Sequence, residues 1–297
     1  MISEDYKKNV SEYVTDFIPE QFRSACFNYL MAYPDIREIR LRLNGPVSFT
    51  LPESNLVTGM ICTKDDIGFT VNRMTDGSYF KYEEIMRSGY LPLDYGIRCG
   101  IGGEVYTEKS DIKVLKNVSY VNIRIPFTFL TDTTELTDLI KRSQYRCSVL
   151  VFSPPCTGKT TVVRSAAYSL SSGAHKKRVC AVDTNYELQL PYSSEPSLCE
   201  YLTGYPKAKG IEIAVRYMNP EYIVCDEIGT SGESEAICQT QHCGVPLIAT
   251  VHASTFDDVK RRKNILSLLE NNVFDYAMRI VKEGRNFRYE IKSILQI

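Results

Sequence analysis

Residues 147–160 read Cys-Ser-Val-Leu-Val-Phe-Ser-Pro-Pro-Cys-Thr-Gly-Lys-Thr. The apolar run at 147–152 predicts a buried strand, and the segment that begins at Lys159 has its apolar residues at helical spacing. A strand, a short loop and a helix in this order form the context of the phosphate-binding motif G-x-x-x-x-G-K-[ST]. The stretch therefore predicts the P-loop of a nucleotide-binding α/β domain.

The residue types of this loop suit the phosphates of a nucleotide. Loop amides and the positive end of the helix would hold the phosphates, and Gly158 would let the backbone approach them. Lys159 would reach the β- and γ-phosphate oxygens, and the Thr160 hydroxyl would bind Mg²⁺. Ser153 stands where the general motif has glycine, and a chance Gly-Lys-Thr at a helix start is the alternative explanation. The expected binding residues are Ser153, Pro154, Pro155, Cys156, Thr157, Gly158, Lys159, Thr160 and Thr161.

A second, acidic segment supports the first motif. Residues 221–227, Glu-Tyr-Ile-Val-Cys-Asp-Glu, predict an apolar strand that ends in two acids, as in the Walker B segment of P-loop enzymes. Asp226 would hold Mg²⁺, and Glu227 would polarise the attacking water as a catalytic base. The alternative is that the two acids cap a helix that begins near Gly229.

The next apolar strand, predicted at 246–252, ends in Thr250-Val251-His252. At the carboxyl end of a parallel strand, Thr250 or His252 can face the γ-phosphate and report its presence. We therefore count His252 among the expected catalytic residues. A buried structural histidine is the alternative.

The chain is expected to fold as two domains. From residue 146 onward, short apolar runs alternate with helical patterns, which predicts parallel strands with crossover helices. Before that point, residues 5–32 have helical spacing, and the strand-rich segments that follow are punctuated by turn signals. We predict an α+β domain over residues 1–130 and an α/β P-loop domain over residues 131–297, with a closing hairpin formed by 274–282 and 287–297.

The composition is that of a globular protein. Of 297 residues, 43% are hydrophobic and 24% are charged, and the formal net charge is -1, which argues against wholesale binding of nucleic acid or anionic membrane. The ten cysteines are scattered without C-x-x-C spacing, so we expect reduced thiols in a cytosolic protein. The first residues lack the apolar region of a signal peptide, and no run approaches the length of a membrane-spanning helix. We therefore expect a soluble chain.

Several motifs together resemble the stage III sporulation protein AA family. They are the loop Ser153-Pro-Pro-x-x-Gly-Lys-Thr-Thr161, the stretch Arg216-x-Met218-x-Pro220 ahead of Asp226-Glu227-Ile228-Gly229, and Ala249-Thr250-Val251-His252. In the first half, residues 38–42, 96–101 and 122–125 also match the pattern of the family. The likeness extends from about residue 35 to residue 255, and the Ser-Pro-Pro start of the loop is itself a family trait.

The resemblance implies a RecA-like ATPase of the type II and type IV secretion superfamily, with a parallel-rich sheet flanked by helices. It implies ATP and Mg²⁺ as ligands, hydrolysis of ATP, and assembly into a homo-oligomer, a hexamer. Such a protein would lie in the cytoplasm on the mother-cell side of the forespore. The cytosolic part of a membrane protein of the same sporulation secretion apparatus would hold it peripherally at the membrane, where it would power or assemble a channel.

In such a hexamer an arginine from elsewhere completes the nucleotide site. Arg98 and Arg124 lie in family-matching segments of the first domain and are the candidates, with ordinary salt-bridged surface as the alternative. After the second core strand the family reads Val-Asp-Glu-Arg-Ser-Glu-Ile, whereas residues 182–188 here read Val-Asp-Thr-Asn-Tyr-Glu-Leu. Glu187 matches the family pattern and is expected near the γ-phosphate. Thr184 stands where the family has a glutamate, so this acidic segment, the acidic box, has one carboxylate fewer here.

Two other functions stay open. The first is a nucleic-acid-handling RecA-like ATPase, but the roughly 45 residues after His252 leave little room for a binding module and show no aromatic–basic stacking pattern. We therefore expect no nucleic acid partner. The second is a nucleotide-dependent scaffold with negligible turnover, which the thinned acidic box favours. Comparing nucleotide binding with turnover separates this scaffold from an ATPase.

Overall fold

The computed structural model describes residues 4–87, 89–108, 111–125, 130–155, 157–190, 196–283 and 286–294. The chain forms two compact units, Met1–Thr128 and Phe129–Ile297. Within the described ranges, no helix is both long enough and apolar enough to cross a membrane.

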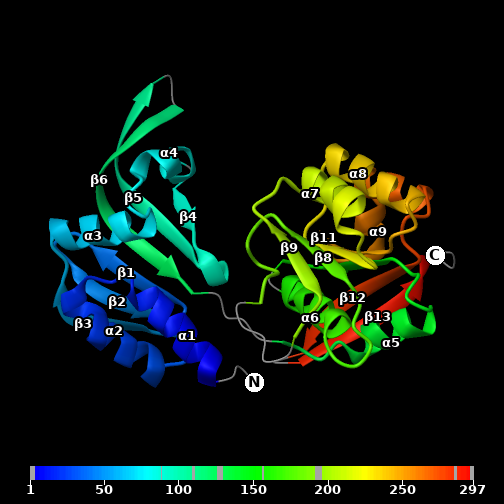
Figure 1. The fold of residues 1–297 in the computed structure, drawn as a ribbon, viewed down its shortest axis with the longest axis horizontal. Helices are drawn as coiled ribbons and strands as arrows, with labels where there is room; N and C mark the ends of the chain where they lie inside the picture. Colours follow the sequence, from blue (N-terminus) through cyan, green and yellow to red (C-terminus); the bar gives the residue numbers. More distant parts are fainter. Residues whose placement is uncertain are drawn as a thin grey trace. The chain divides into compact units, whose positions relative to one another are not determined.

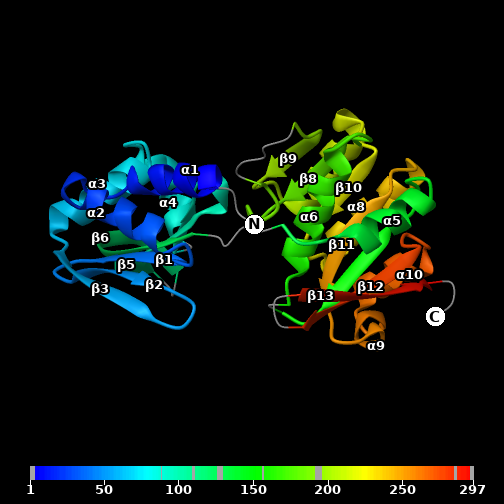
Figure 2. The same cartoon turned by 90° about the horizontal axis from the view of Figure 1, so that it is seen from below.

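The first unit is a six-stranded antiparallel sheet with helices on one face (Figures 1 and 2). Its strand order is β3-β2-β1-β6-β5-β4. Along β1, Ile39 and Leu41 are fully buried and alternate with partly exposed Glu38 and Arg40, so one face of the sheet is apolar and the other polar. The elements are α1 (Glu4–Thr15), α2 (Glu20–Ala32), β1 (Glu38–Arg42), β2 (Pro46–Thr50), β3 (Asn55–Ile61), α3 (Lys64–Met74), α4 (Tyr79–Arg87), β4 (Tyr90–Pro92), the 3₁₀ turn η1 (Asp94–Gly96), β5 (Arg98–Glu108) and β6 (Asp111–Arg124).

The helical segment predicted at 5–32 is two helices rather than one. The first ends at Thr15, and the second begins at Glu20 with Pro19 as its N-cap. Proline has no amide hydrogen and clashes with the preceding helical turn, so it starts a helix more readily than it continues one. Phe17 and Ile18 are buried and lie in the turn between the helices.

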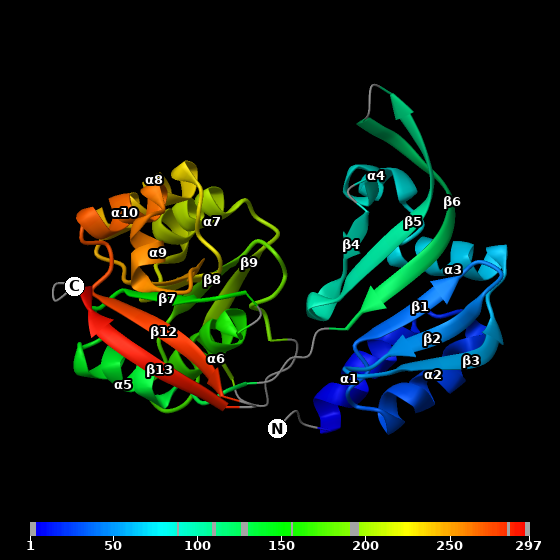
Figure 3. The same ribbon diagram turned by 180° about the vertical axis from the view of Figure 1, so that it is seen from behind.

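The second unit is a seven-stranded sheet in the order β13-β12-β7-β11-β10-β8-β9. Neighbouring strands from β12 to β9 are parallel, and β13 pairs antiparallel with β12 at one edge (Figure 3). The elements are α5 (Thr134–Arg142), β7 (Val149–Ser153), α6 (Lys159–Ser171), β8 (Val179–Asp183), β9 (Cys199–Thr203), α7 (Lys207–Ile213), the π-helical turn η2 (Ala214–Met218), β10 (Tyr222–Cys225), α8 (Ser231–His242), β11 (Leu247–His252), α9 (Phe256–Lys260), α10 (Lys263–Glu270), β12 (Tyr276–Glu283) and β13 (Asn286–Ser293).

Helices cover both faces of this sheet, because its central strands are apolar on both sides. Val149 and Val151 of β7 pack in the core beneath α5 and α6, whereas Leu150 and Phe152 of the same strand pack in the core shared with α7, α8 and α10. The segment that begins at Lys207 is α-helical to Ile213 and then continues as the π-helical turn to Met218. The carboxyl ends of the parallel strands lead into the loops that form the candidate site.

Candidate functional site

The loop between β7 and α6 passes through a left-handed residue just before the helix. Gly158 has a φ of 96° and is the N-cap of α6. A Cβ atom at this position would lie 2.6 Å from ring atoms of Phe287 on β13. The backbone conformation and the packing therefore both require glycine here, and the aromatic ring supports the end of the loop.

Lys159, the first residue of α6, is buried and folds its side chain back under the loop. Its Nζ donates hydrogen bonds of 2.8 Å to the carbonyl oxygens of Ser153 and Pro154. The Thr157 hydroxyl donates to the Pro154 oxygen at 2.5 Å and shares a hydrogen bond with the Ser153 hydroxyl. A phosphate oxygen is a stronger acceptor than a carbonyl for an ammonium group. The amine is thus placed to exchange these contacts for the phosphates of a nucleotide.

The other expected loop residues contribute less to the described contacts. Pro155 is exposed in the loop. Thr161 lies in the first turn of α6, where its carbonyl accepts a hydrogen bond of 2.7 Å from the Ser165 hydroxyl. Cys156 lies outside the described residues.

Thr160 on α6 contacts Asp226, the residue that follows β10. The Thr160 hydroxyl donates to Asp226 Oδ2 at 2.6 Å, and the Thr250 hydroxyl on β11 donates to the other carboxylate oxygen. Hydroxyl and carboxylate oxygens are hard ligands of the kind that Mg²⁺ prefers, so this donor set fits magnesium. Among the described residues, no three His, Cys, Asp or Glu side chains gather to hold a metal by themselves. Magnesium at this place would therefore depend on phosphates and water for its remaining ligands.

Glu227 adopts a left-handed backbone conformation, with a φ of 55°. Its amide donates to Thr250 Oγ1 at 2.7 Å, and its carboxylate Oε1 lies 3.0 Å from His252 Nε2. The side chains of Glu227 and His252 are 54% and 32% exposed, so water can reach the carboxylate. Thr250 links the two acids, and His252 is a partner of Glu227 rather than a fully buried structural residue.

The two acids after β10 do not cap α8. The amides of Gly229 and Thr230 donate instead to Glu233, at 2.9 Å each. Lys207, a buried lysine, lies beside this carboxylate and donates to the backbone oxygen of Glu227. Sequence reasoning missed Lys207 and Glu233. The one signal for either was the capping pattern Thr230-x-x-Glu233.

Asp183 at the end of β8 organises the segment expected near the γ-phosphate. Its buried carboxylate accepts the backbone amides of residues 187–189 at distances between 2.7 and 3.0 Å. Burial raises the pKa of this carboxyl, the three amides oppose that rise, and the charge of Asp226 adds to it. The carbonyl of Glu187 accepts a hydrogen bond of 2.8 Å from Arg164. The Asp183 carboxylate thus holds the backbone of residues 187–189, and Arg164 holds Glu187 through its main-chain oxygen.

The two candidate arginines belong to the first unit. Arg98 of β5 and Arg124 of β6 are directly opposite each other, and Glu38 of β1 is opposite Arg124 on its other side. Burial raises the pKa of Glu38, but hydrogen bonds from Arg40 and the charge of Arg124 outweigh burial and lower it. Like charges facing each other across a sheet repel, and Glu38 places a carboxylate in the same row beside Arg124.

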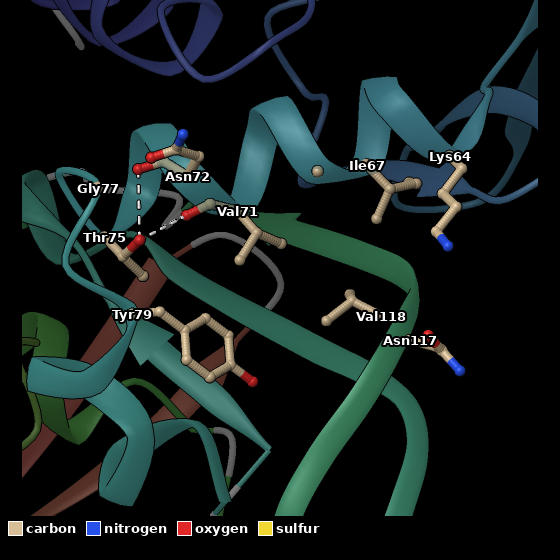
Figure 4. A pocket seen from close by; sticks show the side chains of 10 residues that line it. Lys64, Ile67, Val71, Asn72, Thr75, Gly77, Tyr79, Asn117 and Val118 are labelled. Atoms are coloured by element: carbon tan, nitrogen blue, oxygen red, sulfur yellow. Dashed lines mark hydrogen bonds between the residues drawn. The ribbon is translucent and has the colours of Figure 1, made fainter.

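A cavity of about 330 Å³ lies in the first unit between α3 and β6 (Figure 4). Its walls include Ile67, Val71 and Val118, together with Tyr79, whose hydroxyl donates to the Leu115 oxygen at 2.9 Å. No acidic side chain occurs among its lining residues, so it offers no carboxylate to a metal ion. The candidate nucleotide site remains the P-loop and its neighbours in the second unit, where Thr160 contacts Asp226.

A family model described as "Sporulation stage III, protein AA" matches residues 8–295. The stage III sporulation protein AA of Bacillus subtilis (strain 168) is 27% identical over 271 residues, which is 88% of each chain. Among solved structures, the Legionella pneumophila ATPase DotB is similar with a TM-score of 0.61 at 14% identity, covering 87% of this chain and 77% of that one. The pilus retraction motor PilT with bound ADP is similar with a TM-score of 0.61 at 13% identity, covering 87% and 79%.

At these identities the structural likeness shows the fold alone. That fold is the mixed α/β, RecA-like fold of the secretion ATPases, which confirms the prediction made from the sequence. The resemblance carried by the motifs is confirmed as well, because the family model spans nearly the whole chain. The chain belongs to the sporulation stage III protein AA family.

Proposed function

We propose that this protein binds ATP with Mg²⁺ and hydrolyses it. The observation that carries the proposal is the hydrogen bond of 2.6 Å between Thr160 and Asp226, which lie 66 positions apart in the chain. It joins the P-loop helix to the acidic end of β10, as a shared metal site requires. Beside it, Glu227 is half exposed and paired with His252. This arrangement supports transfer of a phosphoryl group to water rather than nucleotide binding alone.

Each residue of the site has one task in this proposal. Lys159 binds the β- and γ-phosphates, together with the amides of the loop at 153–161. Thr160 and Asp226 hold magnesium, which when bound neutralises charge on the phosphates. Glu227 accepts a proton from the attacking water. His252, at 3.0 Å, keeps the Glu227 carboxylate in place.

Two substitutions test the proposal. Lys159→Ala should weaken binding of a fluorescent ATP analogue because it removes the phosphate contact, whereas Lys141→Ala at an exposed position on α5 should not. Glu227→Gln keeps the shape of the side chain but removes the base, so binding should stay while hydrolysis falls by about 10²–10⁴-fold. Unchanged affinity in Lys159→Ala would reject the P-loop site. Native turnover in Glu227→Gln would move the base elsewhere, with Glu187 as the first candidate.

We further propose a ring in which an arginine of a neighbouring subunit completes the site. Charge that develops on the γ-phosphate needs a cation beyond the one that serves the ground state, and Arg98 and Arg124 are two cations that face each other across β5 and β6. Arg124→Ala, and to a smaller degree Arg98→Ala, should keep ATP affinity within a few-fold yet lose turnover. Adding Lys159→Ala subunits should restore part of the activity of Arg124→Ala. Absence of rescue in co-assembled rings would place the arginine within its own subunit.

The family points to a role in sporulation. We propose that the assembled hexamer powers or assembles a secretion-type channel between mother cell and forespore. The cytosolic part of a membrane partner would bring it to the membrane on the mother-cell side. Adding that part should raise both the ATPase rate and the particle size, whereas single-stranded nucleic acid should leave the rate unchanged. Stimulation by nucleic acid alone would favour a nucleic-acid-handling ATPase instead.

A nucleotide-dependent scaffold with negligible turnover is the second candidate. Asp183 has its carboxylate occupied by three backbone amides, and Thr184 and Asn185 replace an acid and an arginine of the family pattern. Both features reduce the number of carboxylates near the site that could act on a nucleotide. ATP binding and ATP-dependent assembly together with negligible turnover in the wild-type protein would select the scaffold over the ATPase.

A further inference from the structure

Lys207, the first residue of α7, is buried against the loop that joins β10 to α8. The residue is 8% exposed, and α7 and α8 pack side by side on one face of the sheet (Figure 1). Its Nζ donates to the main-chain oxygen of Glu227 and lies 3.5 Å from Oε1 of Glu233, whose side chain is 15% exposed. A buried ammonium is costly unless it is both paired and hydrogen-bonded. Here it is both.

Two contacts fix the main chain of Glu227 from opposite sides. Its amide donates to Thr250 Oγ1 at 2.7 Å, and its carbonyl oxygen accepts the hydrogen bond from Lys207. Rotation about φ would move the amide and rotation about ψ would move the carbonyl, so these contacts hold both torsions. The φ of 55° is unfavourable for a residue that carries a Cβ atom, and it persists only where the surroundings impose it.

Glu233 braces the same loop from its other end. Its Oε2 accepts the amides of Gly229 and Thr230 at 2.9 Å each, while Oε1 faces the Lys207 ammonium. Burial raises the pKa of Glu233, but the two amides and the charge of Lys207 outweigh burial and lower it. The carboxylate is therefore an anion that balances the ammonium and holds the start of α8.

We propose that Lys207 is a positioning residue for Glu227. Its ammonium, balanced by Glu233, holds the left-handed backbone that directs the Glu227 carboxylate to His252 and to the attacking water. An apolar side chain of similar size would fill the space and avoid the cost of a buried charge, so the hydrogen bond, rather than packing, explains a lysine here. The inference rests on the proposed ATP hydrolysis, but it also makes a structural prediction that does not depend on turnover.

The kinetic test uses Lys207→Met, which removes the charge and the hydrogen bond but keeps the length of the side chain. Because Lys207 acts through the base, the Kd for ATP with Mg²⁺ should stay within a few-fold while kcat falls by about 10–100-fold, as when a catalytic group is displaced by about 1 Å. The matched control is Lys177→Met, which removes the Lys177–Glu221 pair at 3.1 Å just before β10. The control should leave kcat within about threefold. Unfolding midpoints of both variants establish that they remain folded under assay conditions.

A double variant shows whether Lys207 acts through Glu227. If it does, Lys207→Met should cause little further loss of turnover once Glu227→Gln has removed the base. Losses that multiply in the double variant would show that the lysine acts by another route, and would overturn the inference.

A second measurement separates this inference from the proposed function. The chain has three histidines, His175, His242 and His252, so imidazole signals in a proton NMR spectrum can be assigned with a His252→Gln variant. Glu227→Gln should shift the His252 signals at fixed pH, because the carboxylate lies 3.0 Å from the ring. Lys207→Met should shift them in the same direction, and Lys177→Met should not.

The outcomes of the two measurements are distinct. Unchanged His252 signals in Lys207→Met would overturn the positioning role even if the protein hydrolyses ATP normally. A protein that shows the shift but has no turnover would keep the positioning role and reject only the proposed hydrolysis.

Discussion

Thr250→Val removes one hydroxyl that two neighbouring residues share. Thr250 is fully buried on β11. Its hydroxyl donates to Asp226 Oδ1 and accepts the Glu227 amide at 2.7 Å. Valine has nearly the same shape but can make neither hydrogen bond. The substitution therefore takes the acceptor away from the Glu227 amide and one donor away from the Asp226 carboxylate.

We expect the second unit to lose about 3 kcal/mol of stability. A hydrogen bond to a charged group contributes about 1.5–3 kcal/mol, and a buried donor left without a partner costs about 1–3 kcal/mol. The additional methyl group offsets about 0.8 kcal/mol of this loss. In a unit of this size a change of 1 kcal/mol moves Tm by about 2–4 °C, so the expected fall in Tm is about 6–12 °C.

The assay compares Thr250→Val with Thr250→Ser. Serine keeps the hydroxyl and deletes one methyl group, which should cost only about 1 kcal/mol. Thermal and urea unfolding measure the stability of both variants, and an ATPase assay measures kcat. Valine should lower kcat by about tenfold or more, because both acids lose a support that places them, while serine stays near the wild-type value. A valine variant as stable and as active as the serine variant would refute the role given to this hydroxyl.

Three further results are expected. Gly158→Ala places a Cβ atom on a left-handed residue and 2.6 Å from Phe287. The substitution should lower the stability by about 2 kcal/mol and abolish nucleotide binding. A native affinity measured by calorimetry would contradict this expectation. Glu233→Gln should cost about 3 kcal/mol at neutral pH, because it leaves Lys207 buried without its counter-charge. Folding lowers the pKa of Glu233, so this deficit is fully present above the ordinary pKa of a glutamate and shrinks as the pH falls through the lowered pKa. Urea unfolding across pH measures the deficit, and a constant deficit would argue against the ion pair. Chelation of Mg²⁺ should weaken ATP binding to the wild type, whereas binding to Asp226→Asn should respond little to the chelator.

The parallel core of the second unit could be predicted from the sequence because its strands are apolar throughout. The strands β7, β8, β10 and β11 are buried at nearly every residue. The predicted bounds of β7, β10 and β11 differ from the observed ones by at most two residues. The edge strand β9 was not predicted. It reads Cys-Glu-Tyr-Leu-Thr and buries only Leu202, so it has neither an apolar run nor a clean alternation.

At the candidate site, the sequence likewise reveals contiguous motifs but not contacts between distant elements. The loop at 153–161 and the pair Asp226 and Glu227 stand out in the sequence, because each motif is contiguous and follows an apolar strand. The structure brings Thr160 and Asp226 into contact, and the roles assigned to these residues stay predictions. The roles of Lys207 and Thr250 could not be predicted. A lysine at the start of a short helix predicts a solvated side chain, and its burial depends on a carboxylate carried by another helix. The left-handed conformation of Glu227 likewise depends on partners from two other elements.

The hairpin β12–β13 completes the surroundings of β7 and of the loop that follows this strand. The strand β12 pairs with β7, Phe287 of β13 packs on Gly158, and Ser148 donates its amide to Asp275 at 2.7 Å across 127 positions of the chain. At about 5–20 residues per second, a ribosome needs roughly 6–25 s to add those positions. Until then, β7 lacks its partner β12 and Gly158 lacks its aromatic support. The strand partner β12 and the aromatic support of Gly158 therefore reach the loop only after residues up to Phe287 have been synthesised.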